Sequence, residues 1–254
     1  MSLAEICKDL YCILRFYPFE NTPGPKRGRE LEKVFDDYCL SKSLRLVEHP
    51  GSSTLFGYKS LSGIGHEVDG SINGGDWKLH IELKAYRQEV PKDQVMLFNE
   101  RSLDYYFAFF RNGKSYNLYR AFVTDSPLEL MVRRFCYSWS IITVEPDRLP
   151  IPVILEYLRR EKWEQFFEFG ILQEVERILP RYSLPLDQIL VRIYDPLPSI
   201  CIKGSMLPSP KDLDEIEEIH AFISDEVLET IEEADPEHFE GHTEKLLHDA
   251  GLFT

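Results

Sequence analysis

The chain has 254 residues, of which 43% are hydrophobic and 13% aromatic, a composition typical of a globular protein. It contains no run of about eighteen apolar residues, and its N-terminus lacks a basic and then apolar signal segment, so we expect neither a membrane span nor export. The 5 cysteines form no Cys-x-x-Cys pair and, being odd in number, no simple disulfide framework. Reduced thiols, no zinc site and a cytoplasmic location are therefore predicted.

The net charge of −14 is unevenly distributed along the chain. Residues 1–148 contain 20 Lys and Arg and 20 Asp and Glu, whereas residues 149–254 contain 9 and 23. Because phosphate binding depends mainly on basic side chains, any nucleic-acid contact is expected in the first part. We predict a domain of mixed α/β class over residues 1–148 and a mostly helical, acidic region over residues 149–254, with a proline-rich linker at about 196–210.

In chain order, an amphipathic helix is predicted from Gly28, after a loop at residues 23–25. Its apolar stripe repeats at i, i+3, i+4 and i+7 and comprises Leu31, Val34, Phe35 and Tyr38. One strand should follow, at residues 44–48 or at residues 54–58. Two further strands, at 66–72 and 77–84, are joined by Asn73-Gly74-Gly75-Asp76, which is strong turn chemistry.

The remaining elements are predicted from the same signals of periodicity and turn chemistry. Downstream of the hairpin we expect a helix at 91–101, an aromatic strand at 104–110, a two-residue hairpin turn within 111–114, a strand at 115–123, a helix at 127–137 and a strand at 140–144. In the acidic region we expect helices at 151–169 and 171–179, a possible strand at 188–194, and two acidic amphipathic helices at 212–234 and 237–250.

The hairpin at 66–84 separates polar from apolar side chains. With Ile72 opposite Trp77, the two-residue period places six apolar side chains on one face: Val68, Ile72, Trp77, Leu79, Ile81 and Leu83. The other face carries Glu67, Asp69, His80, Glu82 and Lys84. Asp69 would lie across from His80 and diagonal to Glu82. Two carboxylates can hold Mg²⁺ or Mn²⁺, and a lysine beside them can place or deprotonate a water molecule.

Two other interpretations of this hairpin are open. Its polar face could simply be solvated, as in many half-buried hairpins. Residues 69–74 also resemble the first half of a calcium-binding EF-hand loop, although His80 stands where that loop has a glutamate and the flanking residues alternate like strands. His66 and His80 flank the polar face and are left outside the predicted site.

The order α-β-β-β-α-β, with an aspartate ending the second strand and Glu-x-Lys on the third, resembles the PD-(D/E)XK nuclease superfamily, which has the restriction-endonuclease-like fold with a mixed sheet. Gly28-Arg29-Glu30-Leu31-Glu32 is similar to the first-helix motif of its Mrr-like branch. Residues 67–70 and 81–85 are similar to the two catalytic motifs, although Val68 stands where the literal motif has proline. The resemblance covers residues 26–124.

This resemblance implies roles for individual residues. Asp69, Glu82 and the Leu83 carbonyl would bind the metal ion, and Lys84 would orient and activate water. Glu32 would reach the same ion directly or through water, although helical periodicity alone does not choose between Glu32 and Glu30. Gln94 would position the water or the scissile phosphate. The basic side chains expected to contact nucleic acid are Lys26, Arg27, Arg29, Lys33 and Lys92.

Two functions follow from these expectations. The first is a Mg²⁺-dependent or Mn²⁺-dependent endonuclease acting on DNA, with RNA as the alternative substrate, in restriction, defence, mobile-element or repair biology. The second is an inactive nuclease-fold subunit that binds a protein partner or regulates a nucleic-acid complex through its acidic C-terminal helices. The modest set of basic residues argues against extended duplex binding by a monomer and fits a small footprint, a homodimer or help from a partner. The acidic helices could dock on a basic surface and restrain the nuclease site.

Overall fold

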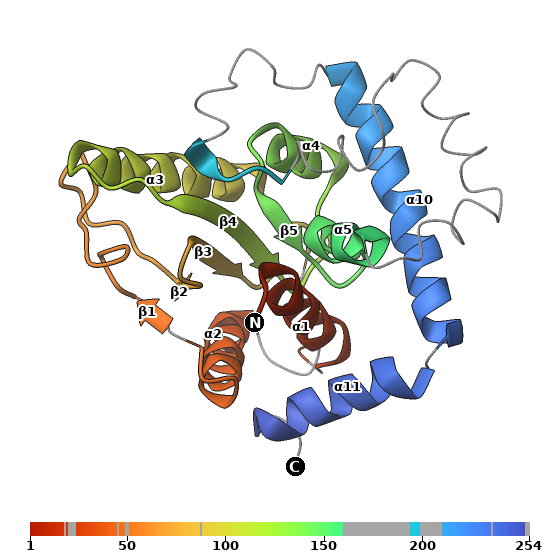
Figure 1. Cartoon of the computed structure of the whole chain (residues 1–254). Coiled ribbons are helices and arrows are strands. Elements are labelled where there is room, and N and C mark those ends of the chain that lie inside the picture. Colours follow the sequence, from red (N-terminus) through yellow and green to blue (C-terminus); the bar gives the residue numbers. More distant parts are fainter. Residues whose placement is uncertain are drawn as a thin grey trace.

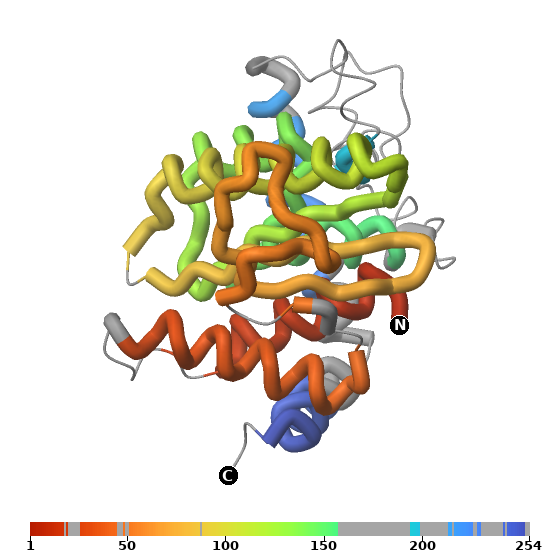
Figure 2. Tube along the Cα trace, turned by 90° about the vertical axis from the view of Figure 1, so that its left-hand side faces the viewer, coloured from red at the N-terminus to blue at the C-terminus, as the bar shows by residue number. Residues whose placement is uncertain are grey.

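A five-stranded mixed sheet lies between two layers of helices (Figures 1 and 2). The structure is a computed structural model that describes residues 1–17, 19, 24–44, 46–48, 51–86, 88–159, 194–198, 210–234 and 236–251. The strands, in the spatial order β1-β2-β3-β4-β5, are β1 Leu46–Glu48, β2 Gly70–Asn73, β3 Trp77–Lys84, β4 Asn117–Thr124 and β5 Ile142–Val144. The helices are α1 Leu3–Phe16, α2 Gly24–Ser41, α3 Lys92–Arg111, α4 Leu130–Ser138, α5 Ile151–Arg159, α10 Pro210–Ala234 and α11 Pro236–Asp249.

The predicted α-β-β-β-α-β order is confirmed by α2-β1-β2-β3-α3-β4. Strands β1, β2 and β3 pair antiparallel, and β3, β4 and β5 pair parallel, so the sheet is mixed as expected for a restriction-endonuclease-like core. Of the two segments considered for the first strand, residues 46–48 form β1, whereas Leu55 and Tyr58 only close a short turn. The parallel β3–β4 pair requires a crossover, which α3 supplies.

The two faces of the sheet have different coverings. Helices α1 and α2 lie below the sheet in Figure 2 and bury an apolar face that includes Leu79, Ile81 and Leu83 of β3. Helix α3 lies on the opposite face, where Phe98 packs with Phe122 of β4. The sheet is therefore the central layer, and both of its faces are removed from water.

The polar face of β3 is buried beneath α3. Lys78, His80 and Glu82 are 7%, 1% and 2% exposed. The solvated interpretation of the hairpin is therefore wrong, because α3 covers the face that this interpretation leaves to water. A buried row of ionisable groups has a desolvation cost and needs nearby partners.

The hairpin register differs from the prediction by two residues. Ile72 pairs with Leu79 rather than lying opposite Trp77, and Ser71 pairs with His80. The reason is a turn that closes later, with the Gly74 amide donating to the Trp77 carbonyl and Gly75 at a φ of 98°. A shift of two residues keeps every strand side chain on its predicted face. Val68 is the exception, since it packs in a separate cluster with Tyr105 and Leu118.

The predicted aromatic strand at 104–110 is wrong, because α3 continues through these residues to Arg111. Most of the buried side chains of this helix recur every three or four residues, which is the helical period: Val95, Phe98, Asn99, Ser102, Tyr105, Tyr106 and Phe109. The predicted hairpin turn is instead the end of α3, where Asn112 is the C-cap and Gly113 has a φ of 67°.

The first helix, α1, was not predicted. Its sequence signal is a capping box, in which the Ser2 hydroxyl accepts from the Glu5 amide at 3.1 Å and Glu5 accepts from the Ser2 amide. Helix α2 also begins earlier than predicted, at Gly24. Pro25 is tolerated in its first turn, since those amides have no partner within the helix.

The acidic helices predicted in the C-terminal region are confirmed as α10 and α11. Ile216, Ile219 and Ile223 of α10 join the same apolar core as α1 and the sheet. Figure 1 shows α10 beside α4 and α5, at the β5 edge of the sheet and away from β1. The predicted division at residues 148/149 stays a prediction.

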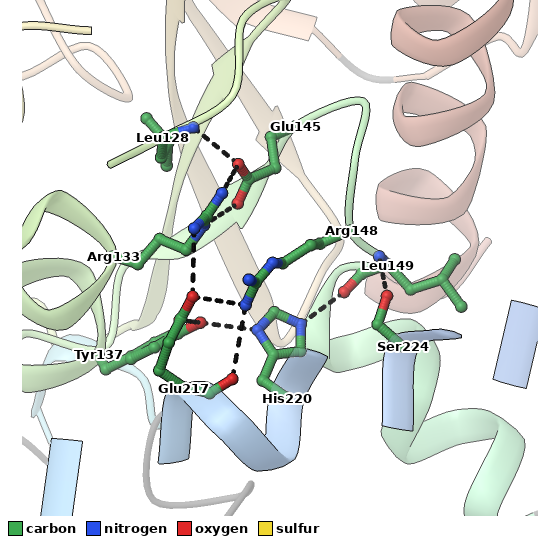
Figure 3. A network of polar contacts seen from close by, with 9 residues as sticks. All are labelled: Leu128, Arg133, Tyr137, Glu145, Arg148, Leu149, Glu217, His220 and Ser224. Atoms are coloured by element: carbon green, nitrogen blue, oxygen red, sulfur yellow. Dashed lines mark hydrogen bonds and ion pairs between the residues drawn. The ribbon is translucent and has the colours of Figure 1, made fainter. Parts of the chain in front are cut away.

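A buried polar network fixes α10 to the rest of the chain (Figure 3). The Glu217 carboxylate accepts from Arg133 at 3.1 Å and from the Tyr137 hydroxyl at 2.8 Å, and it is also paired with Arg148. Arg133 makes two further hydrogen bonds of 2.9 Å to Glu145. His220 lies 2.7 Å from the Tyr137 hydroxyl and 2.8 Å from the Leu149 carbonyl. Glu217, one of the acids of α10, thus meets basic side chains of its own chain.

Several predicted elements lie outside the described residues. These are the helix at 171–179, most of the possible strand at 188–194, the second half of the helix at 151–169 and most of the proline-rich stretch. Among the helices that the structure describes, none combines the length and the apolar character that crossing a bilayer requires.

Candidate metal and phosphodiester site

Asp69, Glu82 and Lys84 meet where β3 ends beside the start of β2. Glu82 and Lys84 point to the same side of β3 because side chains alternate along a strand. Asp69 immediately precedes β2, and its Oδ2 accepts from the Leu83 backbone amide at 2.8 Å. The corrected register therefore brings Asp69 beside residues 82–84, closer to Glu82 than the predicted pairing with His80 allowed.

The Lys84 ammonium is bound by three oxygen atoms. Its Nζ lies 2.9 Å from Asp69 Oδ2, 2.8 Å from Glu82 Oε1 and 3.2 Å from the Leu83 carbonyl oxygen. The side chains of Asp69 and Glu82 are 6% and 2% exposed, whereas that of Lys84 is 23% exposed. The two carboxylates are thus enclosed, and the lysine side chain lies on the side that opens to solvent.

The electrostatics of this cluster are dominated by burial. Burial and the neighbouring Asp69 charge raise the pKa of the Glu82 carboxyl to about 7, although Lys84 and Arg101 act in the opposite direction. Burial lowers the pKa of Lys84, but the charges of Glu82 and Asp69 outweigh it and leave that pKa above its ordinary value. The lysine stays protonated, and its single charge does not fully compensate two enclosed carboxylates.

The donor set fits a hard divalent cation. Asp69 Oδ2, Glu82 Oε1 and the Leu83 carbonyl are oxygen ligands, which Mg²⁺ and Mn²⁺ prefer, and they already surround one positively charged atom. The raised pKa of the Glu82 carboxyl indicates that nearby cations do not fully compensate its charge, which also favours a bound cation. Among the described residues, however, no three Asp, Glu, His or Cys side chains are grouped to hold a metal ion. Glu32 therefore does not complete a three-carboxylate cluster.

Glu32 and Glu30 of α2 have different surroundings. The pKa of the Glu32 carboxyl is raised by partial burial and by the charges of Asp69 and Glu67, and it is lowered by Lys84. Glu32 is thus within electrostatic reach of the site. Glu30 instead accepts a hydrogen bond of 2.9 Å from the Tyr17 hydroxyl. The tertiary structure makes a distinction between the two acids that helical periodicity did not.

The other predicted site residues surround this cluster less closely. Gln94 is half-exposed in the first turn of α3, and its side chain makes no hydrogen bond to any of the described residues. Four of the predicted phosphate contacts are exposed: Lys26, Arg29, Lys33 and Lys92. Arg27 differs, because its guanidinium is paired with the buried Asp125 at the end of β4. That pair fastens the start of α2 to the sheet.

Arg101 lies near the cluster but was not assigned to it from the sequence. Arg101 of α3 has its NH1 atom 3.7 Å from Glu82 Oε1. It lies seven residues after Gln94, and this spacing, which keeps two residues on one helix face, is the signal that could have identified it.

His80 also faces α3 but plays a different part. The single Ser102 hydroxyl hydrogen is donated to the Phe98 carbonyl at 2.7 Å, so His80 Nδ1, 3.3 Å away, acts as donor to that hydroxyl. Burial, with nearby Arg120 and Arg101, lowers the pKa of His80 to about 3. His80 is therefore a neutral imidazole packed between β3 and α3 and is unsuited to acid catalysis at neutral pH.

The structure is similar to the crystal structure of the small subunit, R.BspD6I2, of the heterodimeric restriction endonuclease R.BspD6I. The two share 16% sequence identity, and the match covers 80% of this chain and 100% of that chain with a TM-score of 0.33. A TM-score this low carries no conclusion about function. No family model matches the sequence, and no curated protein matches it. The functional assignment therefore depends on the geometry of the site.

Proposed function

We propose that this chain is a metal-dependent endonuclease that hydrolyses phosphodiester bonds in DNA and is related to the Mrr-like branch of the PD-(D/E)XK superfamily. The observation that carries the proposal is the convergence of Asp69 Oδ2, Glu82 Oε1 and the Leu83 carbonyl within 2.8 to 3.2 Å of one cationic atom, Lys84 Nζ. Carboxylates enclosed at 6% and 2% exposure are costly to maintain, which favours a functional reason for them.

In this proposal Asp69, Glu82 and the Leu83 carbonyl hold Mg²⁺ or Mn²⁺. The bound ion supplies Lewis-acid chemistry, which lowers the pKa of water and offsets charge on the phosphoryl oxygens. Lys84 holds the attacking water and offsets the charge that develops at phosphorus. Glu32, within reach of the same charges, contacts the ion through water, and Gln94 at the start of α3 positions the water or the phosphate.

Exposed basic side chains provide the contacts to the nucleic-acid backbone. Lys26, Arg29 and Lys33 on α2 and Lys92 at the start of α3 have accessible charges. Arg27 contributes less, because Asp125 already compensates its charge. This footprint is small, so it fits a short contact, a homodimer or a complex with a protein partner better than an extended duplex.

The acidic helices have a structural use that bears on the alternative function. Glu217 of α10 is buried among Arg133, Arg148 and Tyr137, so this acid is not available to a protein partner.

We place the enzyme in the cytoplasm, because Cys7, Cys12, Cys39 and Cys136 are buried free thiols.

A plasmid-nicking assay with Mg²⁺ or Mn²⁺ tests the proposal. The parent should nick or linearise DNA, and Asp69→Asn and Lys84→Ala should each reduce the rate by at least about a hundredfold. Asp76→Asn is a matched control, since Asp76 is exposed in the β2–β3 turn, and it should retain the parent rate. RNA and branched DNA substrates in the same assay define the preferred nucleic acid.

The result can contradict the proposal in two ways. A parent protein that cleaves none of these substrates with either metal would exclude the nuclease and favour an inactive subunit. Cleavage that survives undiminished in both Asp69→Asn and Lys84→Ala would show that the site is elsewhere or that a contaminant is responsible.

A further inference from the structure

Arg101 is a charged residue beside the site that has no role in the mechanism described above. Its NH1 atom is 3.7 Å from Glu82 Oε1, which is longer than a hydrogen bond, and its side chain is 25% exposed. Among the described residues this ion pair is accompanied by no hydrogen bond from the guanidinium. A guanidinium carries five N–H donors, so Arg101 has donors left over beside the Glu82 carboxylate.

Arg101 and Gln94 lie on one face of α3, seven residues apart. Because β3 and β4 are parallel, α3 runs back along the sheet between them. Gln94 and Arg101 are seven residues apart, or about 10 Å along one helix face. Glu82 and Lys84 are two residues apart on β3, or roughly 7 Å. With Arg101 beside Glu82 and α3 antiparallel to β3, these distances predict that Gln94 faces the Lys84 end of β3.

The contacts of Glu82 indicate that Arg101 is not its main partner. Glu82 Oε1 is bound by Lys84 Nζ at 2.8 Å, and Arg101 approaches the same oxygen only to 3.7 Å. A planar fork of donors held near, but not on, a carboxylate is well suited to bind a tetrahedral anion arriving from solvent.

We propose that Arg101 binds a non-bridging oxygen of the phosphate that is to be cleaved and so positions it over Glu82 and Lys84. This assignment rests on the proposed nuclease function. The competing explanation is that Arg101 only balances the charge of Glu82. The two differ in their consequences, because a phosphate ligand contributes to DNA binding, whereas a charge partner of Glu82 contributes mainly to the folded state.

DNA binding measured against salt concentration separates these explanations. Parent, Arg101→Ala and Arg101→Lys are titrated onto a fluorescent duplex with Ca²⁺, and gels verify that the duplex stays intact. Each lost phosphate contact lowers the slope of log K against log salt by about one, so Arg101→Ala should have a shallower slope and about tenfold weaker binding. Arg101→Lys should restore the slope but only part of the affinity, since lysine lacks the fork.

Arg111→Ala is the matched control. It removes an equal charge from the exposed last turn of α3, about 15 Å along the helix from Arg101, and should leave slope and affinity at the parent values. Thermal unfolding of each variant reports any loss of the folded state.

Arg101→Ala with the same slope and affinity as Arg111→Ala would overturn the assignment, whatever its thermal stability. If the parent binds and cleaves DNA in that case, only the role of Arg101 is rejected. A parent that neither binds nor cleaves DNA would contradict the nuclease proposal and this assignment together.

Discussion

Replacing Glu82 by glutamine should stabilise the protein at neutral pH while it removes the proposed metal ligand. The side chain is 2% exposed, and glutamine has the same shape without the charge. Burial and the charge of Asp69 raise the pKa of the Glu82 carboxyl to about 7, against an ordinary 4.5. In the variant Lys84 keeps Asp69 Oδ2 and the Leu83 carbonyl as acceptors.

The size of the effect follows from the pKa difference. The folded protein keeps the Glu82 proton up to about pH 7, whereas the unfolded chain releases it near pH 4.5. Stability of the parent therefore falls as pH rises from 4.5 through 7 and stays lowered above it. At ~1.4 kcal/mol per pKa unit, the advantage of Glu82→Gln should be under about 1 kcal/mol at pH 5 and about 3 kcal/mol at pH 8.

Urea unfolding followed by tryptophan fluorescence, in EDTA at pH 5 and pH 8, measures this difference. Glu100→Gln on the exposed side of α3 is the control, and its stability should stay within about 0.5 kcal/mol of the parent at both pH values. If Glu82→Gln is no more stable than the parent at pH 8, the ionised carboxylate is adequately compensated and the argument from burial is refuted. Nuclease activity should be lost in the same variant.

Three other changes test separate features. Lys84→Ala should tighten Mn²⁺ binding in the absence of DNA by roughly tenfold in calorimetric titration, because it removes the ammonium that competes for the three oxygens. The exposed Lys114→Ala is the control and should leave the affinity unchanged. An unchanged affinity in Lys84→Ala would contradict the proposed metal position. Glu217→Ala should lower the free energy of unfolding in urea by about 3 to 5 kcal/mol, because Arg133, Arg148 and Tyr137 lose this buried partner. A similar loss of stability in the exposed Glu218→Ala would instead indicate a general effect of charge. Gly70→Ala should destabilise the protein by about 1 to 3 kcal/mol, since a Cβ there would lie 2.6 Å from the Phe35 ring. Gly28→Ala, where a Cβ meets no atom within 4 Å, should stabilise α2 by about 0.5 to 1 kcal/mol. Equal effects of the two substitutions in thermal unfolding would exclude the clash with Phe35.

Local sequence patterns predicted the main elements of the core. The stripe Leu31, Val34, Phe35 and Tyr38 predicted α2, and the alternation over residues 77–84 predicted β3 and its two faces. The faces were correct although the register was not, because a shift of two residues preserves the alternation that sorts side chains. The proximity of Asp69 to residues 82–84 depended on that register.

Aromatic residues in the segment 104–110 fit a strand as well as a helix when only local preference is considered. The helix is selected by packing, since Tyr105, Tyr106 and Phe109 continue the stripe that α3 buries against the sheet. The same packing buries the polar face of β3, whose exposure a hairpin pattern cannot predict.

The sequence by itself determined which residue types are available: two acids and a lysine at strand spacing, a helix with two candidate glutamates, and a charge imbalance between the two parts of the chain. Only the tertiary structure decided how they are used. It placed Lys84 among three oxygens, brought Arg101 to Glu82, gave Glu30 and Glu32 different neighbours and joined Glu217 to Arg133 across 84 positions. Periodicity fixes the direction of a side chain within its own element, whereas burial, pKa and pairing arise from elements distant in sequence.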